Sequence, residues 1–559
     1  MRKPLLFTMS GAAVLGAFPL AAAIRSRARL SRAKHPSLTG HVRLAKRIAG
    51  LIPFYDYDEA RFFAADDAPP KVAAQRRAGF ERLAALYRDR FARTLALTAA
   101  ARPYLPDLQF TGAYRVPFQF AAKVRRELGT GAFLERSEGP EVIDLDGNRL
   151  LDLTGSYGVN LFGYEFYKRT IAEGAAIAAD LGPVLGAYHP VVADNARRLA
   201  ELTGLDQVSF HMSGTEAVMQ AVRLARYHTG RQRIVRFAGA YHGWWGEVQP
   251  GIGNPTPSDR TLTLADMSDR SLAVLATRKD IACVLVNPLQ AMHPNVGAPG
   301  DSAMIDSSRG ASVDKAAYRA WLHRLAATCR AAGVVLIFDE VFVGFRLARG
   351  GAAEYFGVRP DLVTYGKTLG GGLPIGVVVG RAALMKRWRD DRPVDINFAR
   401  GTFNAHPYVM GAANAFLRRL DTPEVAALYD GLDERWDARA ALLNARLEAE
   451  GLPVRVANLS TIWTVLYTSP SRYNWMLQYY LRAEGLALSW VGTGRLIFSL
   501  DFDDAWFAQV VERFVAGARA MRADGWWWRA PGVTNKQLRR QVLRETARAR
   551  FSPPPAVRP

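Results

Sequence analysis

An acid and an amine stand at the ends of two short apolar segments in the middle of the chain. Residues 334–338 form a run of five apolar side chains that ends on Asp339, and residues 362–365 are followed by Gly366 and Lys367. Runs of this length, rich in branched side chains, predict buried strands. Because open α/β sheets place their ligands at the carboxyl ends of strands, we expect Asp339 and Lys367 to face one site. Pyridoxal phosphate chemistry needs these two groups, an amine to form a Schiff base and an acid to keep the ring nitrogen protonated.

The flanks of these two residues resemble a known family. DEVFVGFR at residues 339–346 and GKTLGGGLPIG at residues 366–376 are similar to the cofactor core of the class III (fold type I) aminotransferases, in particular to their glutamate-1-semialdehyde aminomutase-like branch. The resemblance covers about residues 110–525. It implies an α/β fold, with a large domain built on a mostly parallel seven-stranded sheet between helices and a small α+β C-terminal domain.

The same resemblance assigns roles to three residues. Lys367 would bind pyridoxal 5'-phosphate covalently and then move a proton between substrate and cofactor carbons. Asp339 would partner the pyridine nitrogen, and Val341 would pack under the ring. Lys367 and Asp339 are thus the expected catalytic residues.

A short Ser-Gly-Thr segment precedes a predicted helix. Ser213, Gly214 and Thr215 lie at its N-terminus, where free amides and the positive end of the helix dipole bind phosphate. The same three residues also fit an ordinary helix cap. Followed by Glu216 and Ala217, and placed before the acid and the Lys, they resemble the phosphate loop of the family.

Two further cofactor contacts come from the resemblance. Tyr241 would stack on the cofactor ring, and His242 continues the family's YHG signature, although a structural histidine is the alternative. ARGTFNAHP at residues 399–407 resembles the GTxxxNP element, in which Thr402 would reach the phosphate of a neighbouring subunit. That role implies a homodimer with shared sites. His406 replaces the usual Asn.

The expected substrate contacts depart from the family pattern. SYGVNLFGYEF at residues 156–166 replaces an SWGP-like segment, so that Ser156 and Tyr157 either border the substrate or only pack. Asn287 stands where the family usually has Glu, and an amide can donate or accept a hydrogen bond but cannot pair with a cation. Residues 292–312, rich in Pro, Gly and Ser, read as a loop over the site.

Length and composition predict several lobes. A chain of 559 residues exceeds the size of a single core. We expect a helical N-terminal extension at 36–109, a first catalytic piece at 110–165, the large cofactor-binding domain at 166–400, the small domain at 401–528 and a basic tail at 529–559. Cys283 and Cys329 are expected as buried free thiols in a reducing compartment. No metal site is expected.

The net charge of +21 raises the question of a polyanionic partner, but no nucleic-acid motif is present. An anionic membrane surface or an acidic protein partner explains charge at the chain ends equally well. Residues 5–24 are mostly apolar and are followed by five cations between Arg25 and Lys34. They read as a membrane anchor, a secretory signal or an overcalled start, and the basic flank favours the cytoplasmic side.

Helices are expected beside both chain ends. Residues 41–52 have one apolar face, which suits either a membrane surface or the enzyme's own surface. Residues 71–100 predict one or two helices with Phe80, Leu83, Leu86, Tyr87 and Phe91 buried, and residues 535–550 predict a basic helix with Leu538 and Val542 on one side.

Three functions fit these observations. The first is an aminotransferase that moves an amino group from an amino donor to an aldehyde or ketone. A looser similarity of the C-terminal segment to synthetase-associated enzymes points to an acyl or polyketide-like acceptor. The second is an intramolecular aminomutase of the glutamate-1-semialdehyde type, and the third is a membrane-associated scaffold without catalysis.

Overall fold

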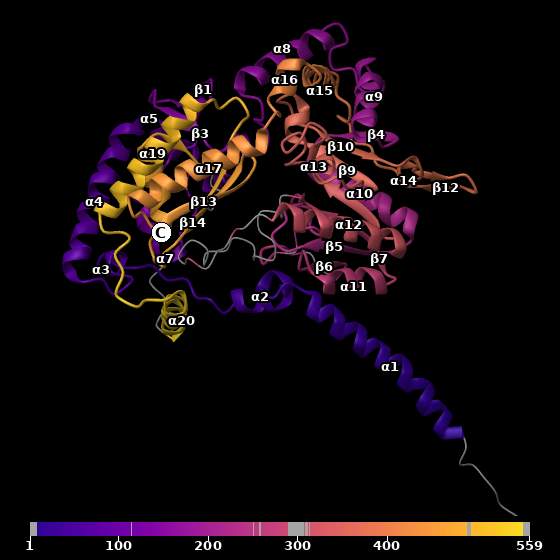
Figure 1. Cartoon of the computed structure of the whole chain (residues 1–559), viewed down its shortest axis with the longest axis horizontal. Helices are drawn as coiled ribbons and strands as arrows, with labels where there is room; N and C mark the ends of the chain where they lie inside the picture. The colour runs from indigo at the N-terminus through magenta and orange to yellow at the C-terminus, as the bar shows by residue number, and fades with distance from the viewer. Residues whose placement is uncertain are drawn as a thin grey trace, which may run out of the picture.

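The computed structural model describes residues 8–112, 114–249, 251–255, 259–288, 307, 311, 314–488 and 494–551, without the side chains of residues 8–20 and 39. Its centre is a seven-stranded sheet in the order β4-β10-β9-β8-β7-β5-β6 (Figure 1). Only β10 runs antiparallel to its neighbours in this sheet. The strands are β4 Gln207–His211, β5 Arg233–Phe237, β6 Thr261–Leu264, β7 Ile281–Val286, β8 Val335–Asp339, β9 Leu362–Gly366 and β10 Gly376–Gly380.

Helices cover both faces of this sheet, which explains why its strands read as continuous apolar runs. Cys283 and Leu285 of β7 pack with helix α10 (Gly214–Thr229), whereas Val284 and Val286 join the core on the other face, where α12 (Lys315–Ala332) packs. Both cysteines are free and buried, as predicted. The predicted fold class is confirmed. The remaining helices of this half are α8 Tyr164–Ala178, α9 Val191–Thr203, α11 Asp269–Thr277, α13 Gly351–Phe356, α14 Ala382–Met385, α15 Pro407–Leu420 and α16 Pro423–Ala427.

A second lobe combines strands from both halves of the chain. A hairpin with Asp146 and Gly147 in its turn joins β2 to β3, with Gly147 at φ +81°, and β15 adds to β3 in parallel. The proposed domain limits remain predictions. The elements are β1 Leu134–Glu138, β2 Glu141–Asp144, β3 Arg149–Asp152, β13 Val454–Leu459, β14 Ile462–Tyr467, β15 Leu486–Ala487, β16 Arg495–Ile497, α17 Leu432–Ala449, α18 Leu477–Ala483 and α19 Asp504–Ala523. A hairpin of β11 Trp388–Arg389 and β12 Arg392–Ile396 projects from the large lobe (Figure 1).

The N-terminal extension packs on the second lobe. Arg76 is buried and donates to Gly525 O at 2.9 Å and to Asp66 at 2.8 Å, and Tyr87 Oη donates to Tyr479 O at 2.8 Å. The long helical stretch forms as two helices, but Leu86 is 39% exposed, so its predicted burial is wrong. It lies about 100° around the helix from Tyr87. The helices are α2 Val42–Ala49, α3 Glu59–Phe63, α4 Pro70–Arg90, α5 Ala92–Ala101, α6 Leu108–Thr111 and α7 Phe118–Glu127.

Helix α1 (Thr8–Ala33) ends at the edge of the large sheet. Ala265 N donates to Ala33 O at 3.0 Å, and Lys34 forms a bridge with Leu264 of β6. Within the described residues no helix is both long and apolar enough to cross a membrane. The apolar run at 5–24, on which the anchor and signal predictions rest, lies almost wholly outside the side chains that the structure describes.

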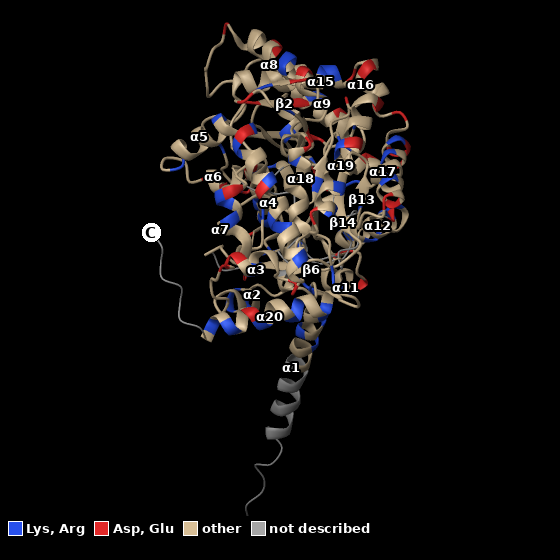
Figure 2. Cartoon of the chain, turned by 90° about the vertical axis from the view of Figure 1, so that its left-hand side faces the viewer, with Lys and Arg blue, Asp and Glu red and all other residues tan. Residues whose placement is uncertain are grey.

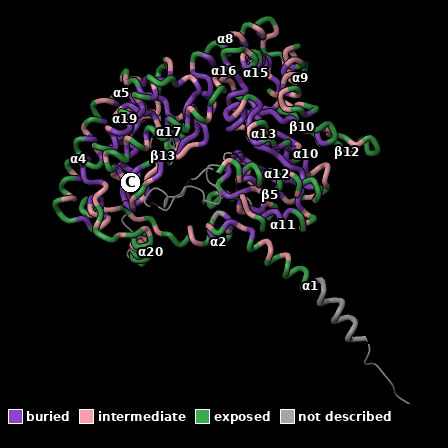
Figure 3. Tube along the Cα trace, viewed as in Figure 1, coloured by how far each residue is buried: buried purple, intermediate pink, exposed green. Residues whose placement is uncertain are grey.

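The predicted basic tail helix is present as α20 (Asn535–Phe551). Leu538 is buried and Val542 packs against the core, so the two residues predicted on one side of the helix both face inward. In two perpendicular views α20 lies beside α2 at one end of the molecule (Figures 1 and 2). Helices α2 and α20 are mostly exposed or half-buried, whereas the buried residues concentrate inside the two lobes (Figure 3).

Candidate active site

Asp339 is the last residue of β8 and is almost fully buried. Its Oδ2 accepts a hydrogen bond from His242 Nδ1 at 2.7 Å. Its Oδ1 accepts from Val341 N at 3.1 Å and from the Thr364 hydroxyl at 3.2 Å. Three donors from three segments therefore fix the orientation of one carboxylate at the end of the sheet. The neighbouring Glu340 accepts instead from the amide of Ala353 at the start of α13, at 2.8 Å.

His242 is buried behind that carboxylate. Burial lowers the pKa of His242, although its hydrogen bond to Asp339 acts in the opposite direction. Its Nε2 is buried and has no hydrogen-bond partner among the described residues. A neutral ring that donates from Nδ1 leaves Nε2 as an acceptor. His242 is thus placed to hold Asp339 in position rather than to act on a substrate.

Lys367 follows β9 directly and has a left-handed backbone, with φ +45°. This conformation is unfavourable for a residue with a side chain and is concentrated at functional sites. Burial lowers the pKa of Lys367, opposed by the carboxylate of Asp339 and aided by the guanidinium of Arg346. Its Nζ lies 5.6 Å from the centre of the Phe342 ring. A larger neutral fraction of this amine makes it a better nucleophile and base.

Two glycines bring the remaining loops onto this pair. A Cβ on Gly214 would lie 2.5 Å from Cγ1 of Val341, and a Cβ on Gly243 would lie 2.5 Å from Oγ1 of Thr215. Gly243 also has φ +89°. The backbone of Gly214 can therefore approach Val341, and that of Gly243 can approach Thr215, because neither glycine carries a side chain.

Ser213 caps helix α10. Its hydroxyl accepts from Glu216 N at 3.3 Å, and Glu216 accepts in turn from Met212 N at 3.0 Å. The Ser213 side chain therefore acts as an ordinary helix N-cap, which was the alternative to phosphate binding. The amides of Gly214 and Thr215 belong to the first helical turn, where N–H groups lack helical partners and attract an anion.

The aromatic side chains predicted for the site, Tyr157 and Tyr241, are about half exposed to solvent. Tyr241 is 57% exposed and Tyr157 is 48% exposed. A Cβ on Gly158 would lie 3.3 Å from Cδ of Lys367, which places the segment of Tyr157 beside the Lys. Burial and the charge of Asp339 raise the pKa of Tyr241, so its hydroxyl stays protonated.

Ser156, Asn287 and Thr402 differ in how the structure places them. Ser156 bonds to the Tyr164 hydroxyl at 2.9 Å and has φ +45°. Asn287 is buried directly after β7. Thr402 lies on an exposed turn, and within the described part of this single chain no contact joins it to the other predicted site residues. The predicted loop at 292–312 falls outside the described residues, except for 307 and 311.

Arg346 is a site residue that the sequence did not reveal. It is fully buried and donates to Thr461 Oγ1 at 3.0 Å, to Phe498 O at 2.7 Å and to Asn160 O at 3.1 Å. These contacts tie the segment after Asp339 to the second lobe. Its position at the end of the DEVFVGFR segment was the one signal in the sequence that could have indicated a role. The sequence could not show what Arg346 binds, because its partners lie more than 100 positions away.

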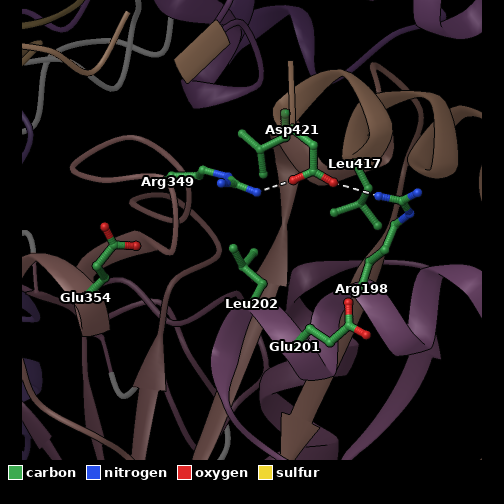
Figure 4. Close-up of a pocket in the computed structure, with 8 residues that line it drawn as sticks. Arg198, Glu201, Leu202, Arg349, Glu354, Leu417 and Asp421 are labelled. Atoms are coloured by element: carbon green, nitrogen blue, oxygen red, sulfur yellow. Dashed lines mark hydrogen bonds and ion pairs between the residues drawn. The ribbon is translucent and has the colours of Figure 1, made fainter. Parts of the chain in front are cut away.

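A separate pocket of about 380 Å³ lies between α9 and α15 (Figure 4). Asp421 forms ion pairs there with Arg349 and with Arg198, the latter at 2.6 Å. None of its lining residues belongs to the predicted site. Because its two arginines already share a carboxylate, we interpret this pocket as part of the surface ion-pair network.

Comparison with known proteins decides the family. The model of the family "Aminotransferase class-III" matches residues 123–517. The chain belongs to the class III aminotransferases. Glutamate-1-semialdehyde 2,1-aminomutase of Nitratidesulfovibrio vulgaris (strain DP4) is 34% identical over 363 residues, which are 63% of this class III aminotransferase and 82% of the relative. The protein of the same name from Desulfotalea psychrophila is 33% identical over 374 residues, covering 63% and 81%.

Solved structures agree with the fold of this class III aminotransferase. An omega-transaminase from Sphaerobacter thermophilus aligns with a TM-score of 0.61 and 26% identity, over 77% of this chain and 98% of that one. A glutamate-1-semialdehyde-aminomutase from Pseudomonas aeruginosa PAO1 aligns with a TM-score of 0.64 over 80% and 99%, at 19% identity, which shows the fold alone. The predicted enzyme class and the cofactor, pyridoxal phosphate, are confirmed.

Proposed function

We propose that this enzyme transfers an amino group from an amino donor to an aldehyde or ketone acceptor in two half-reactions. Family membership establishes class III transamination or aminomutase chemistry on amino and carbonyl compounds. The observation that carries the proposal is the placement of Lys367 beside the segment of the half-exposed Tyr157 and near the carboxylate of Asp339, whose orientation three hydrogen bonds fix.

The residues fit the cofactor. The first turn of α10, with the amides of Gly214 and Thr215, would hold the phosphate, and Asp339 would hold the ring nitrogen. Val341 and Tyr241 would flank the ring. When bound, pyridoxal phosphate supplies an aldehyde that takes up the amino group and a ring that stores electrons released at the substrate carbon.

Each protein group then has a defined task. Lys367, whose pKa burial lowers, would take the proton from the substrate carbon and deliver it to the cofactor carbon. Asp339, whose orientation is fixed by three hydrogen bonds, would face the ring nitrogen. His242 maintains that orientation from behind.

The acceptor that we propose carries an apolar chain, such as an acyl or polyketide-like carbonyl compound, delivered free or on an acyl carrier protein. Tyr157, Tyr241 and Trp244 are all at least 48% exposed near the site and offer apolar surface. Asn287 replaces a carboxylate and cannot pair with a cation, which argues against glutamate-1-semialdehyde itself.

Two specific proposals concern assembly and location. A homodimer, with Thr402 facing a partner's site, gives that exposed residue a function. The cytoplasmic side of a membrane, with attachment through the N-terminus, agrees with the basic flank from Arg25 to Lys34 and with two free buried thiols.

An intramolecular aminomutase is the second candidate, because the two relatives described above bear that name at 33 to 34% identity. The scaffold hypothesis has the least support, since the chain belongs to an enzyme family and has both Lys367 and Asp339.

The absorption spectrum of the purified protein, with and without a panel of amino donors, tests the proposal. One donor should change the cofactor's absorption band, and an acceptor should restore it. Lys367→Ala should abolish turnover, while a fully active variant would contradict the assignment. Conversion of glutamate-1-semialdehyde with no response to any donor would favour the aminomutase.

A further inference from the structure

The positive charge of the chain is concentrated at its two ends. Residues 1–55 contain ten Lys and Arg and no Asp or Glu, and residues 535–559 contain seven Lys and Arg and one Glu. Together the two segments account for 16 of the 21 net positive charges. Both lie outside the family match at 123–517, so the catalytic fold does not explain them.

The fold brings these two segments together. Arg550 at the end of α20 donates to Leu51 O beyond α2 at 2.7 Å, and the hydroxyls of Tyr55 and Thr546 are 3.4 Å apart. Figure 2 shows α2, α20 and the adjoining part of α1 at one end of the molecule, dense in Lys and Arg. We call residues 25–54 and 535–551 the basal face.

Little acidic charge opposes these cations. Glu545, the acid of α20, turns inward and binds Arg472 at 3.0 Å and Arg61 at 2.5 Å. Asp259 pairs with Arg43 at 2.6 Å. Lys536, Arg540 and Arg544 recur every four residues along α20, where all three are exposed, and among the described residues none of them has an ion-pair partner.

Apolar side chains are exposed among these cations. Around α2 they are Leu44, Leu51, Ile52 and Phe54, which are between 47% and 60% exposed. On α20, Leu543 is 67% exposed and Phe551 is 86% exposed. Exposed apolar residues in a basic surface are the composition of helices that lie in the headgroup region of anionic membranes.

We propose that the basal face docks on the surface of an anionic membrane. Each Lys or Arg near an anionic leaflet strengthens binding about fivefold, and the apolar side chains enter the headgroup boundary. Docking of this kind needs no spanning helix. A nucleic acid would use the same cations but would leave the apolar side chains without a role, so we commit to the lipid surface.

Co-sedimentation of the full-length holoenzyme with phosphatidylcholine vesicles, with and without phosphatidylglycerol, tests this proposal. The key variant combines Lys536→Glu, Arg540→Glu and Arg544→Glu. The control combines Arg88→Glu, Arg102→Glu and Arg125→Glu, which makes the same change in net charge at exposed arginines of α4, the α5 C-cap and α7. Cofactor absorption and thermal melting establish that both variants are folded.

The wild type should bind vesicles that contain phosphatidylglycerol, and high salt should release it. The α20 variant should bind at least tenfold more weakly, whereas the control should stay within about twofold of wild type. In a second variant, Leu543→Ser with Phe551→Ser should also weaken binding.

Three results would overturn the proposal. Equal binding of the α20 variant would show that α20 takes no part in attachment and that the two segments do not form one docking surface. Equal binding to neutral vesicles would remove the role of charge, and binding of a single-stranded RNA without binding of vesicles would make the face a nucleic-acid site. Lys367→Ala should bind vesicles as wild type does, so this test stands apart from the proposed reaction.

Discussion

At the scale of single residues, the site depends on buried groups whose charge is controlled by their neighbours. Asp339 has three hydrogen-bond donors, and His242 behind it is buried with a lowered pKa. Burial also lowers the pKa of Lys367, which favours its neutral amine form. One desolvated environment therefore gives a neutral histidine and a more reactive amine.

His211 gives a pH-dependent prediction. It ends β4, just before the Ser-Gly-Thr loop, and burial together with Arg387 lowers the pKa of His211 from 6.5 to about 4. Between these values the unfolded chain binds a proton that the folded chain does not, so the free energy of unfolding falls as pH drops. The wild type should lose free energy of unfolding between pH about 7 and about 5, and His211→Gln should make this loss smaller by roughly 2 kcal/mol. Urea unfolding at the two pH values measures it.

The control for this prediction is His323→Gln, on the exposed side of α12. It should lose stability in acid just as the wild type does. An unchanged acid loss in the His211 variant would mean that this ring becomes protonated without cost in the folded protein.

At the scale of elements, strand β10 supports the phosphate loop at one of its ends. A Cβ on Gly376 would lie 1.9 Å from Ser213 O, whereas a Cβ on Gly380, at the other end, would meet the side chain of Leu362 at 2.2 Å. Gly376→Ala must move the loop backbone, so it should weaken cofactor binding at least about tenfold. Titration of the apoenzyme measures this.

Gly380→Ala is the matched control, because it moves a side chain in the core instead of the loop. It should reduce the melting temperature and leave cofactor affinity within about threefold of wild type. Equal loss of cofactor affinity in both variants would show that β10 acts only through global stability.

Helix α20 is fixed by a charge network that includes a fully buried cation. The side chain of Arg472 is 1% exposed and pairs with Glu545, to which Tyr57 also donates at 2.5 Å. Glu545→Ala leaves Arg472 buried without that partner and should cost about 3 to 5 kcal/mol of stability in denaturant unfolding. Glu512→Ala, which breaks the exposed pair with Arg446, should cost less than about 1 kcal/mol. Equal effects would contradict a special role for the buried cation.

The two strands that lead to Asp339 and Lys367 were predictable to within one residue at each end, because each is a short run of apolar side chains. The predicted run at 334–338 became Val335–Asp339, and that at 362–365 became Leu362–Gly366. Local pattern could not reveal what Arg346 binds, since its partners Thr461 and Phe498 come from distant segments. The prediction that Leu86 is buried was wrong for a different reason, because a residue at the border of a helical face can lie on its buried or its exposed side.

At the scale of the whole molecule, the projecting β11–β12 hairpin points to assembly. Val394, Ile396 and Phe398 are between 59% and 93% exposed, and Thr402 follows four residues later. The protein should elute with twice the 61.6 kDa mass of one chain in light-scattering chromatography. Ile396→Glu with Phe398→Glu should give monomers that lose cofactor.

Leu442→Glu, at a half-exposed site on α17, provides the control and should remain dimeric. A wild type that elutes as a monomer with full activity would rule out shared sites and would leave the exposed hairpin without this explanation.

The packing of the N-terminal extension on the second lobe determines the order in which the chain can fold. Arg76 donates to Gly525 O, 449 positions later, as well as to the nearby Asp66, and Tyr87 donates to Tyr479 O, 392 positions later. Ribosomes add about 5 to 20 residues per second, so the first helices wait on the order of half a minute for the surface that buries them. Phe80 of α4 meets Phe62 and Phe63 early, but Tyr87 and Arg76 still lack their distant partners during synthesis. The extension therefore cannot complete its native packing until nearly the whole chain has been made.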